Sequence, residues 1–423
     1  MKKFLAACLG KLTGRVLQKY QPRIIAVTGS VGKTTTKIAI AAVLQTKFSV
    51  RSATKNYNNE LGLPLAILGL DAPGKNPFKW FAIFAEGFRL LLSQDPRFPH
   101  VLVLEFGADH PGDIAYLLKI AQPQIGVVTA VAAAHTEFFG SVEGVLAEKK
   151  LVVTRLAEGG TAILNTDDEL IASLKPEIKA QIITYGCNTG EIRASRAQIH
   201  YTMSGDPDGI EVGITTDDGE VGFLVAGVLG RPVAYAAAAA VAVGRIFNLS
   251  NSEIANGLAL ADFPPGRMRI IPGIKNTTLI DDTYNASPRA AAEALRVLAE
   301  IQGSGRRVAV LGDMLELGAM TEDEHRKIGL LAAASDVALL VTVGAASRAS
   351  GAGAREAGMS EDQIFHFDNA ADAGLFLQDR IMTGDYILVK GSQGVRCEKI
   401  VKELMAQPLR APQLLVRQSK AWL

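Results

Sequence analysis

The stretch IIAVTGSVGKTTT, at residues 24–36, decides the fold of this chain. It opens with a β-branched, apolar run that is typical of a buried strand in a parallel sheet. An alanine-rich helical pattern follows at residues 38–44, and between the two lies the turn Gly29-Ser30-Val31-Gly32-Lys33-Thr34-Thr35. Glycines let backbone N–H groups approach an anion, and the N-terminus of a helix favours negative charge. The stretch therefore predicts a loop that binds the phosphates of a nucleotide.

Two side chains of this turn strengthen the prediction. Lys33 adds a positive charge, and the hydroxyl of Thr34 is placed to ligate Mg²⁺. The spacing departs from the general pattern at one point, because Val27 stands where the first glycine would be. The same letters alone could form an ordinary turn, but the strand before them and the helix after them favour nucleotide binding.

Composition limits the classes of protein to which the chain can belong. Its 423 residues favour about two to three domains, and 48% hydrophobic with 21% charged residues describe a soluble protein with an ample core. The net charge of +1 gives no electrostatic case for a nucleic-acid partner. Three cysteines (Cys8, Cys187 and Cys397) lie far apart, without metal-binding spacing or a disulfide framework. We therefore expect a cytoplasmic protein.

Two apolar segments each allow two interpretations. Residues 1–22 predict a short N-terminal helix that leans on the first domain. The alternative is a lipoprotein signal ending at Cys8, but Lys11 interrupts its apolar stretch. Residues 78–92 (FKWFAIFAEGFRLLL) favour a buried or packing helix. For that segment the alternative is a peripheral membrane or protein contact.

Polar residues follow several expected strands. Glu105 ends an apolar strand at residues 100–105, and ligands of open α/β sheets bind at that end, so Glu105 is a candidate Mg²⁺ ligand. His135 follows the strand at residues 125–129, and Lys149 lies in a helical pattern at residues 142–156. An asparagine-rich loop near residues 55–62 contributes a further candidate set, Asn56, Asn58 and Asn59.

The second half of the chain changes pattern twice. Short alternating runs at residues 181–228 predict an antiparallel β excursion, and Phe263-Pro264-Pro265-Gly266 is the clearest linker. Strand–helix alternation then restarts. We predict an α/β fold: a central P-loop domain with a doubly wound sheet and the β excursion (residues 23–262), then a second, Rossmann-like α/β domain (residues 263–423). The second domain is expected to reach the nucleotide from across a cleft.

Eight strings in order resemble the Mur ligase family, and most closely its branch that adds D-alanyl-D-alanine. They extend over about residues 22–406 and read TGSVGKTTTK, NYNNELGLPL, LEFGADHPGDI, AHTEFFGSVEGVLAEKK, PPGRM, DDTYNASP, LGDMLELG and LVKGS. The resemblance implies a Mur ligase middle domain followed by a Mur ligase C-terminal domain. Eight motifs at compatible spacing are far more specific than any one of them.

The resemblance also implies roles for individual residues. Catalytic roles fall to Lys33, Glu105, His135 and Lys149, and Mg²⁺ would be held at Thr34, Glu105, His135 and Lys149. Lys149 would be a carbamate formed with CO₂; the alternative is a solvated helix lysine, which Lys150 beside it keeps open. The ATP-binding set continues with Arg267, Asp282, Tyr284 and Asn285. The substrates would face Asn56, Asn58, Asn59, Asp313, Lys390, Gly391 and Ser392.

This chain departs from the family pattern in two places. Pro232 and Ala236 stand where family members usually carry a His and an Asn that flank the adenine, so adenine recognition is expected to differ. Only about 23 residues precede the first strand, too few for a domain. We therefore expect the chain to lack the family's N-terminal domain, which grips the UDP-sugar.

The implied activity is ATP-dependent amide-bond formation by a monomer, through an acyl phosphate. The amine would be D-alanyl-D-alanine or a related amine, and the carboxylate a peptidoglycan-precursor peptide, whether UDP-linked, free of UDP or lipid-linked. Three alternatives remain: a folylpolyglutamate-synthase-like ligase, a P-loop NTPase that binds a partner, and a weakly active scaffold held at a membrane through residues 78–92. The GKTT and DDTYNASP strings argue against the first, and His135, Lys149 and a second α/β domain argue against the second.

Overall fold

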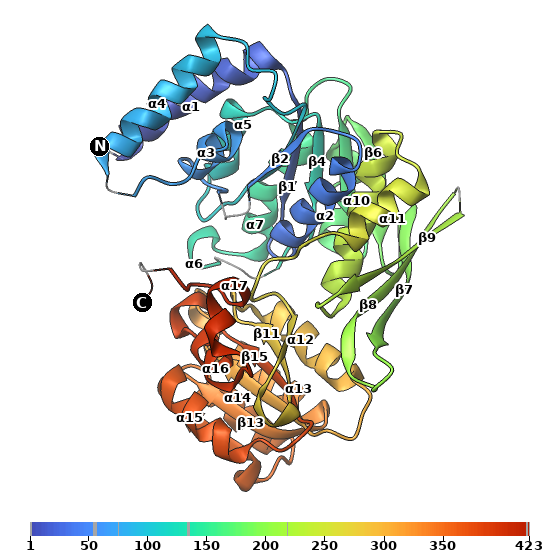
Figure 1. Ribbon diagram of the computed structural model, residues 1–423, viewed down its shortest axis with the longest axis vertical. Coiled ribbons are helices and arrows are strands. Elements are labelled where there is room, and N and C mark those ends of the chain that lie inside the picture. The colour runs from blue at the N-terminus through green and yellow to red at the C-terminus, as the bar shows by residue number, and fades with distance from the viewer. Residues whose placement is uncertain are drawn as a thin grey trace. The chain divides into compact units, whose positions relative to one another are not determined.

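The computed structural model describes residues 2–53, 57–74, 76–132, 136–217, 219–419 and 422 (Figure 1). The chain forms two compact units: unit 1 contains residues 1–196, 212–223 and 232–262, and unit 2 contains residues 197–211, 224–231 and 263–423. The expected boundaries placed residues 197–211 and 224–231 in the first domain. They belong to unit 2 because Ile199 and Leu229 pack into its core and Tyr201 Oη accepts a hydrogen bond from Gln302 N at 2.8 Å.

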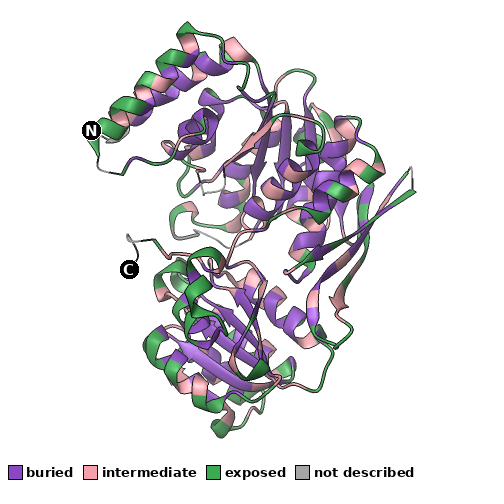
Figure 2. Ribbon diagram, in the orientation of Figure 1, coloured by how far each residue is buried: buried purple, intermediate pink, exposed green. Residues whose placement is uncertain are grey.

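A nine-stranded sheet begins in unit 1, with the strand order β2-β3-β1-β4-β5-β6-β7-β8-β9. The strands are β1 (Arg23–Thr28), β2 (Val50–Ser52), β3 (Val101–Glu105), β4 (Ile125–Val128), β5 (Thr161–Asn165), β6 (Gln181–Gly186), β7 (Ile192–Tyr201), β8 (Pro207–Thr216) and β9 (Gly219–Ala226). All described residues of β3, β4 and β5 are buried (Figure 2). Burial on both faces explains why these strands read as continuous apolar runs. The predicted α/β class is confirmed.

The expected antiparallel excursion begins one strand later than predicted. Strand β6 pairs in parallel with β5, from Thr161 opposite Gln181 to Asn165 opposite Tyr185, and it also pairs in parallel with the start of β7. Residues 202–206 join β7 to its neighbour β8, and so short a connection requires the two strands to run in opposite directions. Alternating hydrophobicity indicates a half-exposed strand but not the direction of its neighbour, so the prediction for β6 was wrong.

Helices cover this sheet and extend beyond it. They are α1 (Lys2–Tyr20), α2 (Lys33–Gln45), α3 (Gly62–Leu68), α4 (Pro77–Leu92), α5 (Asp113–Ile120), α6 (Thr136–Phe139), α7 (Val142–Lys149), α8 (Leu151–Thr154), α9 (Glu169–Ala172), α10 (Arg231–Ile246) and α11 (Asn251–Ala259). The predicted N-terminal helix is α1, which packs on α3, α4 and α5. The single helix expected at residues 142–156 is two helices, α7 and α8. Within the described residues, no helix is both long enough and apolar enough to cross a membrane.

Unit 2 contains a six-stranded sheet with the order β10-β11-β15-β12-β13-β14. Its strands are β10 (Arg269–Pro272), β11 (Thr278–Asp282), β12 (Arg307–Gly312), β13 (Val337–Val343), β14 (Ile364–Phe367) and β15 (Tyr386–Lys390). Only β10, an edge strand that the sequence pattern does not indicate, pairs antiparallel among the registers of this sheet. The carboxyl ends of β11, β15 and β12 therefore lie together at one edge of the sheet.

Both faces of this second sheet are covered by helices. Alternate residues of β12, for example Ala309 and Val310, belong to two different core clusters. One cluster contains residues of α12 (Pro288–Glu300), α13 (Thr321–Ala334) and α14 (Arg348–Glu356), and the other those of α15 (Ala370–Arg380), α16 (Glu398–Leu404) and α17 (Ala411–Leu414). A parallel sheet with two covered faces leaves its strand ends as the place for polar function.

Candidate active site

The loop between β1 and α2, residues 29–32, is shaped by the end of β4. A Cβ atom at Gly29 would lie 2.0 Å from Thr129 Oγ1, so a larger residue would displace the loop. The same hydroxyl of Thr129 donates a hydrogen bond to the carbonyl of Val31 at 2.6 Å. Gly32, with φ of 84°, occupies the N-cap position of α2 and has no side chain with which to cap the helix. The first N–H groups of α2 therefore point into the loop.

Lys33, the first residue of α2, folds back over this loop. Its Nζ donates to the carbonyl of Gly29 at 2.8 Å and to that of Ser30 at 3.4 Å. Ser30 in turn is fixed by its own N–H, which donates to the carbonyl of Ala130 at 2.6 Å. The loop therefore combines a lysine ammonium with the positive end of a helix, which together favour an anion.

A carboxylate lies directly beneath the start of α2. Glu105, the last residue of β3, is 3% exposed. Its Oε2 accepts a hydrogen bond from Thr34 Oγ1 at 2.9 Å, and its Oε1 accepts one from Asn58 Nδ2 at 3.1 Å. Glu105 thus joins the start of α2 to the asparagine-rich segment.

A second lysine of α2, which is buried, completes this cluster. Lys37 Nζ lies 3.6 Å from Glu105 Oε2 and donates to the carbonyl of Ala53 at 2.6 Å. The sequence analysis did not select Lys37. Its spacing of four residues from Lys33 and three from Thr34 places it on the same helix face, which is the pattern that could have indicated it.

The donor set around Glu105 is compatible with Mg²⁺. The ion prefers oxygen ligands and is commonly held by one or two carboxylates together with substrate phosphates. Glu105 and Thr34 supply a carboxylate and a hydroxyl 2.9 Å apart. His135, expected as a further ligand, and Asn56, expected to face the substrate, lie outside the described residues. Among the described side chains there is no group of three or more His, Cys, Asp or Glu residues that could hold a metal by itself.

Lys149 is buried, so the alternative of a solvated helix lysine was wrong. It is the last residue of α7 and is 2% exposed. Burial, followed by the positive charge of Lys33, lowers the pKa of the Lys149 ammonium to about 7, against the opposing charges of Asp109, Glu148 and Glu105. The next residue, Lys150, instead forms an ion pair with Glu177 at 2.6 Å.

The position of Lys149 is fixed by its other neighbour, Glu148. The Glu148 carboxylate accepts hydrogen bonds from Gly112 N at 2.9 Å and from Ile114 N at 2.7 Å, at the start of α5. A carboxylate at a helix N-terminus satisfies free N–H groups and complements the helix dipole. This contact anchors the end of α7 and with it Lys149.

Polar side chains that follow β5 hydrogen-bond to the backbone just after β4, beside the β1–α2 loop. Asn165 Nδ2 donates to the carbonyl of Thr129 at 2.7 Å, and Asp168 Oδ2 accepts from Val131 N at 2.9 Å. Asn59, expected to face the substrate, accepts a hydrogen bond from Gly62 N at 2.9 Å at the start of α3. These contacts position backbone segments around the site.

Helix α10 contains Pro232 and Ala236, the two positions that depart from the residues that flank the adenine in family members. Ala236 is fully buried, while Tyr235 beside it donates a hydrogen bond to Asp167 Oδ2 at 2.8 Å. Asp167 also accepts backbone hydrogen bonds from Cys187, Asn188 and Thr189. In this region Tyr235 therefore ties α10 to the turns after β5 and β6.

Unit 2 has its own polar cluster, at the carboxyl ends of β11, β15 and β12. Lys390, at the end of β15, is 3% exposed; its Nζ lies 2.6 Å from Asp282 Oδ2 and donates to the carbonyl of Asn285 at 3.0 Å. The sequence analysis assigned Asp282 and Asn285 to ATP and Lys390 to the substrates. The structure brings the two sets together in one cluster.

The loops after β12 and β15 hydrogen-bond to each other beside this cluster. Ser392 Oγ accepts a hydrogen bond from Leu315 N at 3.0 Å, and Ser392 N donates to the carbonyl of Asp313 at 2.9 Å. The Asp313 carboxylate accepts from Ser347 N at 2.7 Å. A Cβ atom at Gly391 would lie 2.6 Å from Cys397 Sγ, so glycine is required there by packing.

Arg267 and Tyr284 of unit 2 contact each other. The guanidinium of Arg267 lies 4.2 Å from the centroid of the Tyr284 ring, within the range of a cation–π contact. Arg417, which the sequence analysis did not select, donates to the carbonyls of Thr283 (3.0 Å) and Tyr284. Its sequence neighbours follow no recognisable pattern, so only the folded chain identifies it.

Two protein-family models match this chain and identify its family. The model of the Mur ligase middle domain matches residues 27–76 and 86–244, and that of the Mur ligase glutamate ligase domain matches residues 266–393. The chain belongs to the Mur ligase family.

Individual relatives agree with this assignment. The chain is 30% identical over 407 residues to the UDP-N-acetylmuramoyl-tripeptide–D-alanyl-D-alanine ligase of Bacillus subtilis, covering 95% of this chain and 80% of that protein. A crystal structure of MurF from Acinetobacter baumannii superposes with a TM-score of 0.78 at 28% identity, covering 94% and 79% of the two chains. MurF ligase from Thermotoga maritima, solved in complex with ADP, superposes with a TM-score of 0.76 at 25% identity, covering 94% and 83%.

Proposed function

We propose that the chain is an ATP-dependent ligase that joins D-alanyl-D-alanine, or a related amine, to the peptide carboxylate of a peptidoglycan precursor. The observation that carries the proposal is the cluster around Glu105, where a carboxylate, a hydroxyl and two lysines lie at the start of α2. The relatives named UDP-N-acetylmuramoyl-tripeptide–D-alanyl-D-alanine ligase support the choice of substrates. The relative solved with ADP supports ATP as the co-substrate.

The chemistry requires activation of the carboxylate, because amide formation in water is uphill. The carboxylate oxygen attacks the γ-phosphorus of ATP, which gives an acyl phosphate and ADP. The amine then attacks the acyl carbon, the C–N bond forms as the C–O bond breaks, phosphate leaves and the amine loses a proton. Catalysis of the first step depends on stabilising charge at the transferring phosphoryl group.

Residues of unit 1 supply that stabilisation in this proposal. The β1–α2 loop acts as a P-loop: its N–H groups and the Lys33 ammonium bind the phosphates, and Thr34 and Glu105 hold Mg²⁺, which would neutralise the phosphate oxygens. Lys37 stays 3.6 Å from Glu105 and limits the negative charge there. The buried setting of Glu105 strengthens each of these interactions, because the local dielectric constant is low.

Lys149 acts in this proposal as a carbamate. A neutral amine is needed to attack CO₂, and the lowered pKa of about 7 provides one near neutral pH. The ammonium first loses one proton, and the neutral amine loses a second as its N–C bond to CO₂ forms and one C=O bond of CO₂ becomes a carboxylate, so an anion replaces a cation. That anion would face the positive charge of Lys33, which now repels the ammonium of Lys149.

In unit 2 we assign Arg267 and Tyr284 to the nucleotide and the Lys390 cluster to the substrates. The cation–π contact presents a flat, positively charged surface of the kind that suits a nucleotide. The Lys390–Asp282 pair places hydrogen-bonding groups at the strand ends, where ligands of such sheets bind.

One experiment tests the function directly. ADP release is measured with ATP, Mg²⁺ and a matrix of carboxylates (muramoyl tripeptide with and without UDP, and folate) against amines (D-alanyl-D-alanine, and glutamate). The proposal expects release only when a muramoyl peptide and D-alanyl-D-alanine are both present, with the amide product seen by mass spectrometry. Release with folate and glutamate instead would assign the chain to folylpolyglutamate-type chemistry. Release without any amine would identify an NTPase.

A further inference from the structure

Helix α4 is apolar on both of its faces. Ile83, Gly87 and Leu90 are its buried residues, and they pack toward the body of unit 1. The opposite face exposes a stripe of large apolar side chains at helical spacing: Phe78 (83% exposed), Phe81 (75%), Phe88 (53%) and Leu92 (88%). A surface helix normally carries polar residues on its outer face, and an exposed apolar patch of this kind marks an interaction site.

Basic residues accompany the apolar stripe. Helix α1, which packs beside α4, contains five basic and no acidic residues, and α4 contains two basic and one acidic. The two helices therefore carry a net charge of +6, whereas the whole chain carries +1. Phe4, Lys11 and Arg15 lie on the exposed face of α1. The surface thus combines apolar side chains with a strong positive charge.

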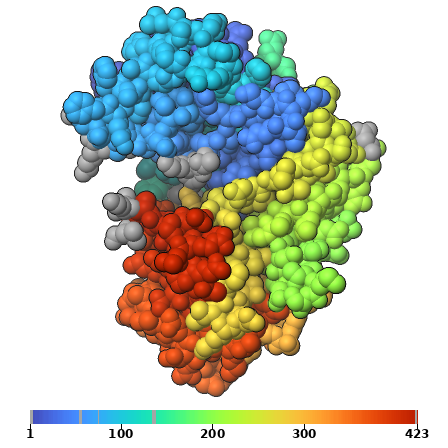
Figure 3. Space-filling view, in the orientation of Figure 1, coloured from blue at the N-terminus to red at the C-terminus, as the bar shows by residue number. Residues whose placement is uncertain are grey.

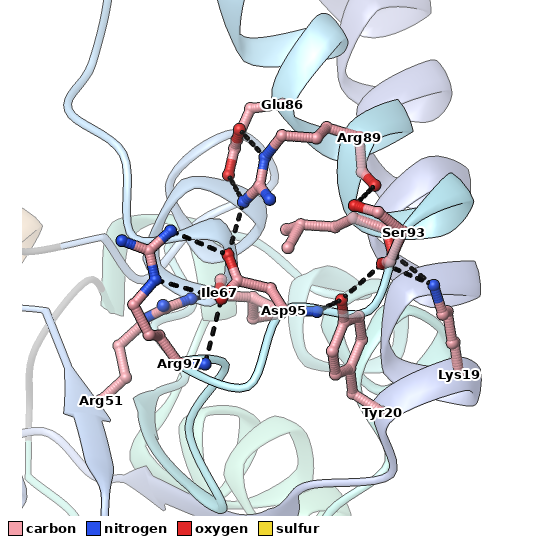
Figure 4. A network of polar contacts seen from close by, with 10 residues as sticks. Lys19, Tyr20, Arg51, Ile67, Glu86, Arg89, Ser93, Asp95 and Arg97 are labelled. Carbon is pink, nitrogen blue, oxygen red and sulfur yellow. Dashed lines mark hydrogen bonds and ion pairs between the residues drawn. The ribbon is translucent and has the colours of Figure 1, made fainter.

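The helix pair is held together rigidly. Gly87 allows close approach, because a Cβ atom there would lie 2.5 Å from Leu12 Cδ2. Lys19 Nζ donates to the last carbonyls of α4, those of Leu90 (2.8 Å) and Leu91 (2.9 Å), and to that of Ser93 (2.7 Å). Figure 4 shows the contact of Lys19 with Ser93 and its continuation through Tyr20, Glu86, Arg89, Asp95 and Arg97.

Asp95 is the centre of that continuation. It is 9% exposed, lies 2.7 Å from Arg89 and 3.2 Å from Arg97, and these two guanidinium groups hold the pKa of its carboxyl far below the usual range. Because the network fixes the end of α4, the apolar stripe cannot turn inward. Residues 77–92 accordingly lie on the surface in the space-filling view (Figure 3).

We propose that α1 and α4 form a docking surface for an anionic lipid bilayer. The apolar stripe enters the boundary between headgroups and acyl chains, while the exposed Lys11, Arg15 and Lys79 remain at the phosphates. The helices lie on the membrane, in agreement with the lack of a spanning helix among the described residues. A second copy of the chain is a poorer occupant, because it would bring one charge of +6 against another. The surface lies outside the residues to which catalysis is assigned, so the inference stands apart from the proposed function.

Vesicle flotation of the full chain tests the proposal. We expect the wild-type protein to float with vesicles of phosphatidylcholine and phosphatidylglycerol, and binding to weaken with salt. Phe81→Ser with Phe88→Ser should lower the partition coefficient at least about tenfold, because two apolar side chains no longer enter the bilayer. The matched controls Leu260→Ser and Leu409→Ser remove exposed leucines elsewhere (82% and 96% exposed) and should bind as the wild type does.

A charge variant and a spectroscopic reading complete the test. Lys11→Glu with Arg15→Glu should weaken binding to the anionic vesicles and leave ATP turnover unchanged. Trp80 lies on α4, and Trp422 is the second tryptophan of the chain. In a Trp422→Phe background, the emission of Trp80 should shift to the blue and be quenched by brominated lipid.

Three results would overturn the proposal. The first is no flotation of the wild-type protein with anionic vesicles, and the second is equal flotation of the phenylalanine double variant. The third is self-association of the wild-type chain that this double variant abolishes, which would make a second copy the occupant. Unfolding temperature, measured for every variant, ensures that a loss of binding is not a loss of fold.

Discussion

Lys390 of unit 2 and Lys149 of unit 1 are both buried, and these two lysines differ in their partners. Lys390 of unit 2 lies 2.6 Å from the carboxylate of Asp282 and also donates to a carbonyl. Lys149 of unit 1 is as deeply buried, yet within the described part of the chain no carboxylate reaches it at ion-pair distance. Its pKa is lowered to about 7, by burial and then by the positive charge of Lys33.

This difference separates two uses of a buried lysine. A paired lysine keeps its charge, positions its partner and serves as a fixed cation for a ligand. A buried lysine without a counter-ion readily gives up its proton and becomes a nucleophile. Lys390 is of the first kind and Lys149 of the second, and four variants test whether the distinction holds.

The largest effect is expected from Lys33→Ala. It removes the charge that we propose binds the phosphates and one of the two causes of the low Lys149 pKa. We expect ATP turnover to fall about 10³-fold with little change in unfolding temperature, because the side chain contacts loop carbonyls and not a core. The matched control is Lys47→Ala, an exposed lysine just beyond α2. Activity within a few-fold of wild type would show that the β1–α2 loop does not bind the phosphates.

Lys149→Ala is expected to lower turnover about 10²-fold, with partial rescue by formate or acetate, which replace the missing anion. The carbamate should form as pH rises through about 7, because only the neutral amine attacks CO₂. Labelled CO₂ and carbon NMR measure it directly. Lys150→Ala is the control, since it removes the neighbouring lysine and only a surface pair with Glu177. If Lys149→Ala turns over ATP like wild type, the carbamate assignment is wrong.

Lys390→Met is expected to act on stability as well as on activity. It leaves the Asp282 carboxylate without its cation in a largely buried site, which costs about 3 kcal/mol of unfolding free energy. Adding Asp282→Asn should recover much of that loss. Arg348→Ala, which removes an exposed pair with Asp368, should change the unfolding free energy little, because solvent screens that pair. Urea unfolding of the wild type, Lys390→Met, Asp282→Asn and the double variant measures the coupling free energy of the pair. Additive losses would mean that the pair does not act as a unit.

The smallest effect concerns Asp281, next to this pair. Burial raises the pKa of its carboxyl to about 6, against hydrogen bonds from Thr283 and Gly266. Since the folded value exceeds the unfolded one, the protonated form stabilises the fold, and that contribution is lost as pH rises from about 4 to about 6. Asp281→Asn should flatten the unfolding free energy across this window, although it keeps only one of the two oxygens that accept from Thr283 and Gly266. An unchanged pH profile would show that Asp281 ionises normally.

The local order of elements could be predicted from the chain itself. Strand β1, the glycine turn and α2 follow from hydrophobic period and from glycine at positions with unusual backbone geometry. The position of Glu105 at a strand end follows from the same periodicity. Each of these depends on residues that are near neighbours in sequence, where propensity and pattern operate.

Contacts between segments distant in the chain decided the features that the sequence did not predict. The direction of β6, the transfer of residues 197–211 to unit 2 and the union of Asp282 with Lys390 depend on segments distant in the chain. Lys149 and Lys150 show the limit most clearly, because these adjacent lysines at the end of α7 differ in which way each faces. The sequence by itself determined the elements and the residue types at their ends. Only the tertiary structure decided which lysine is buried, which is paired and which can lose its proton, because burial and the distance between charges are properties of the folded chain.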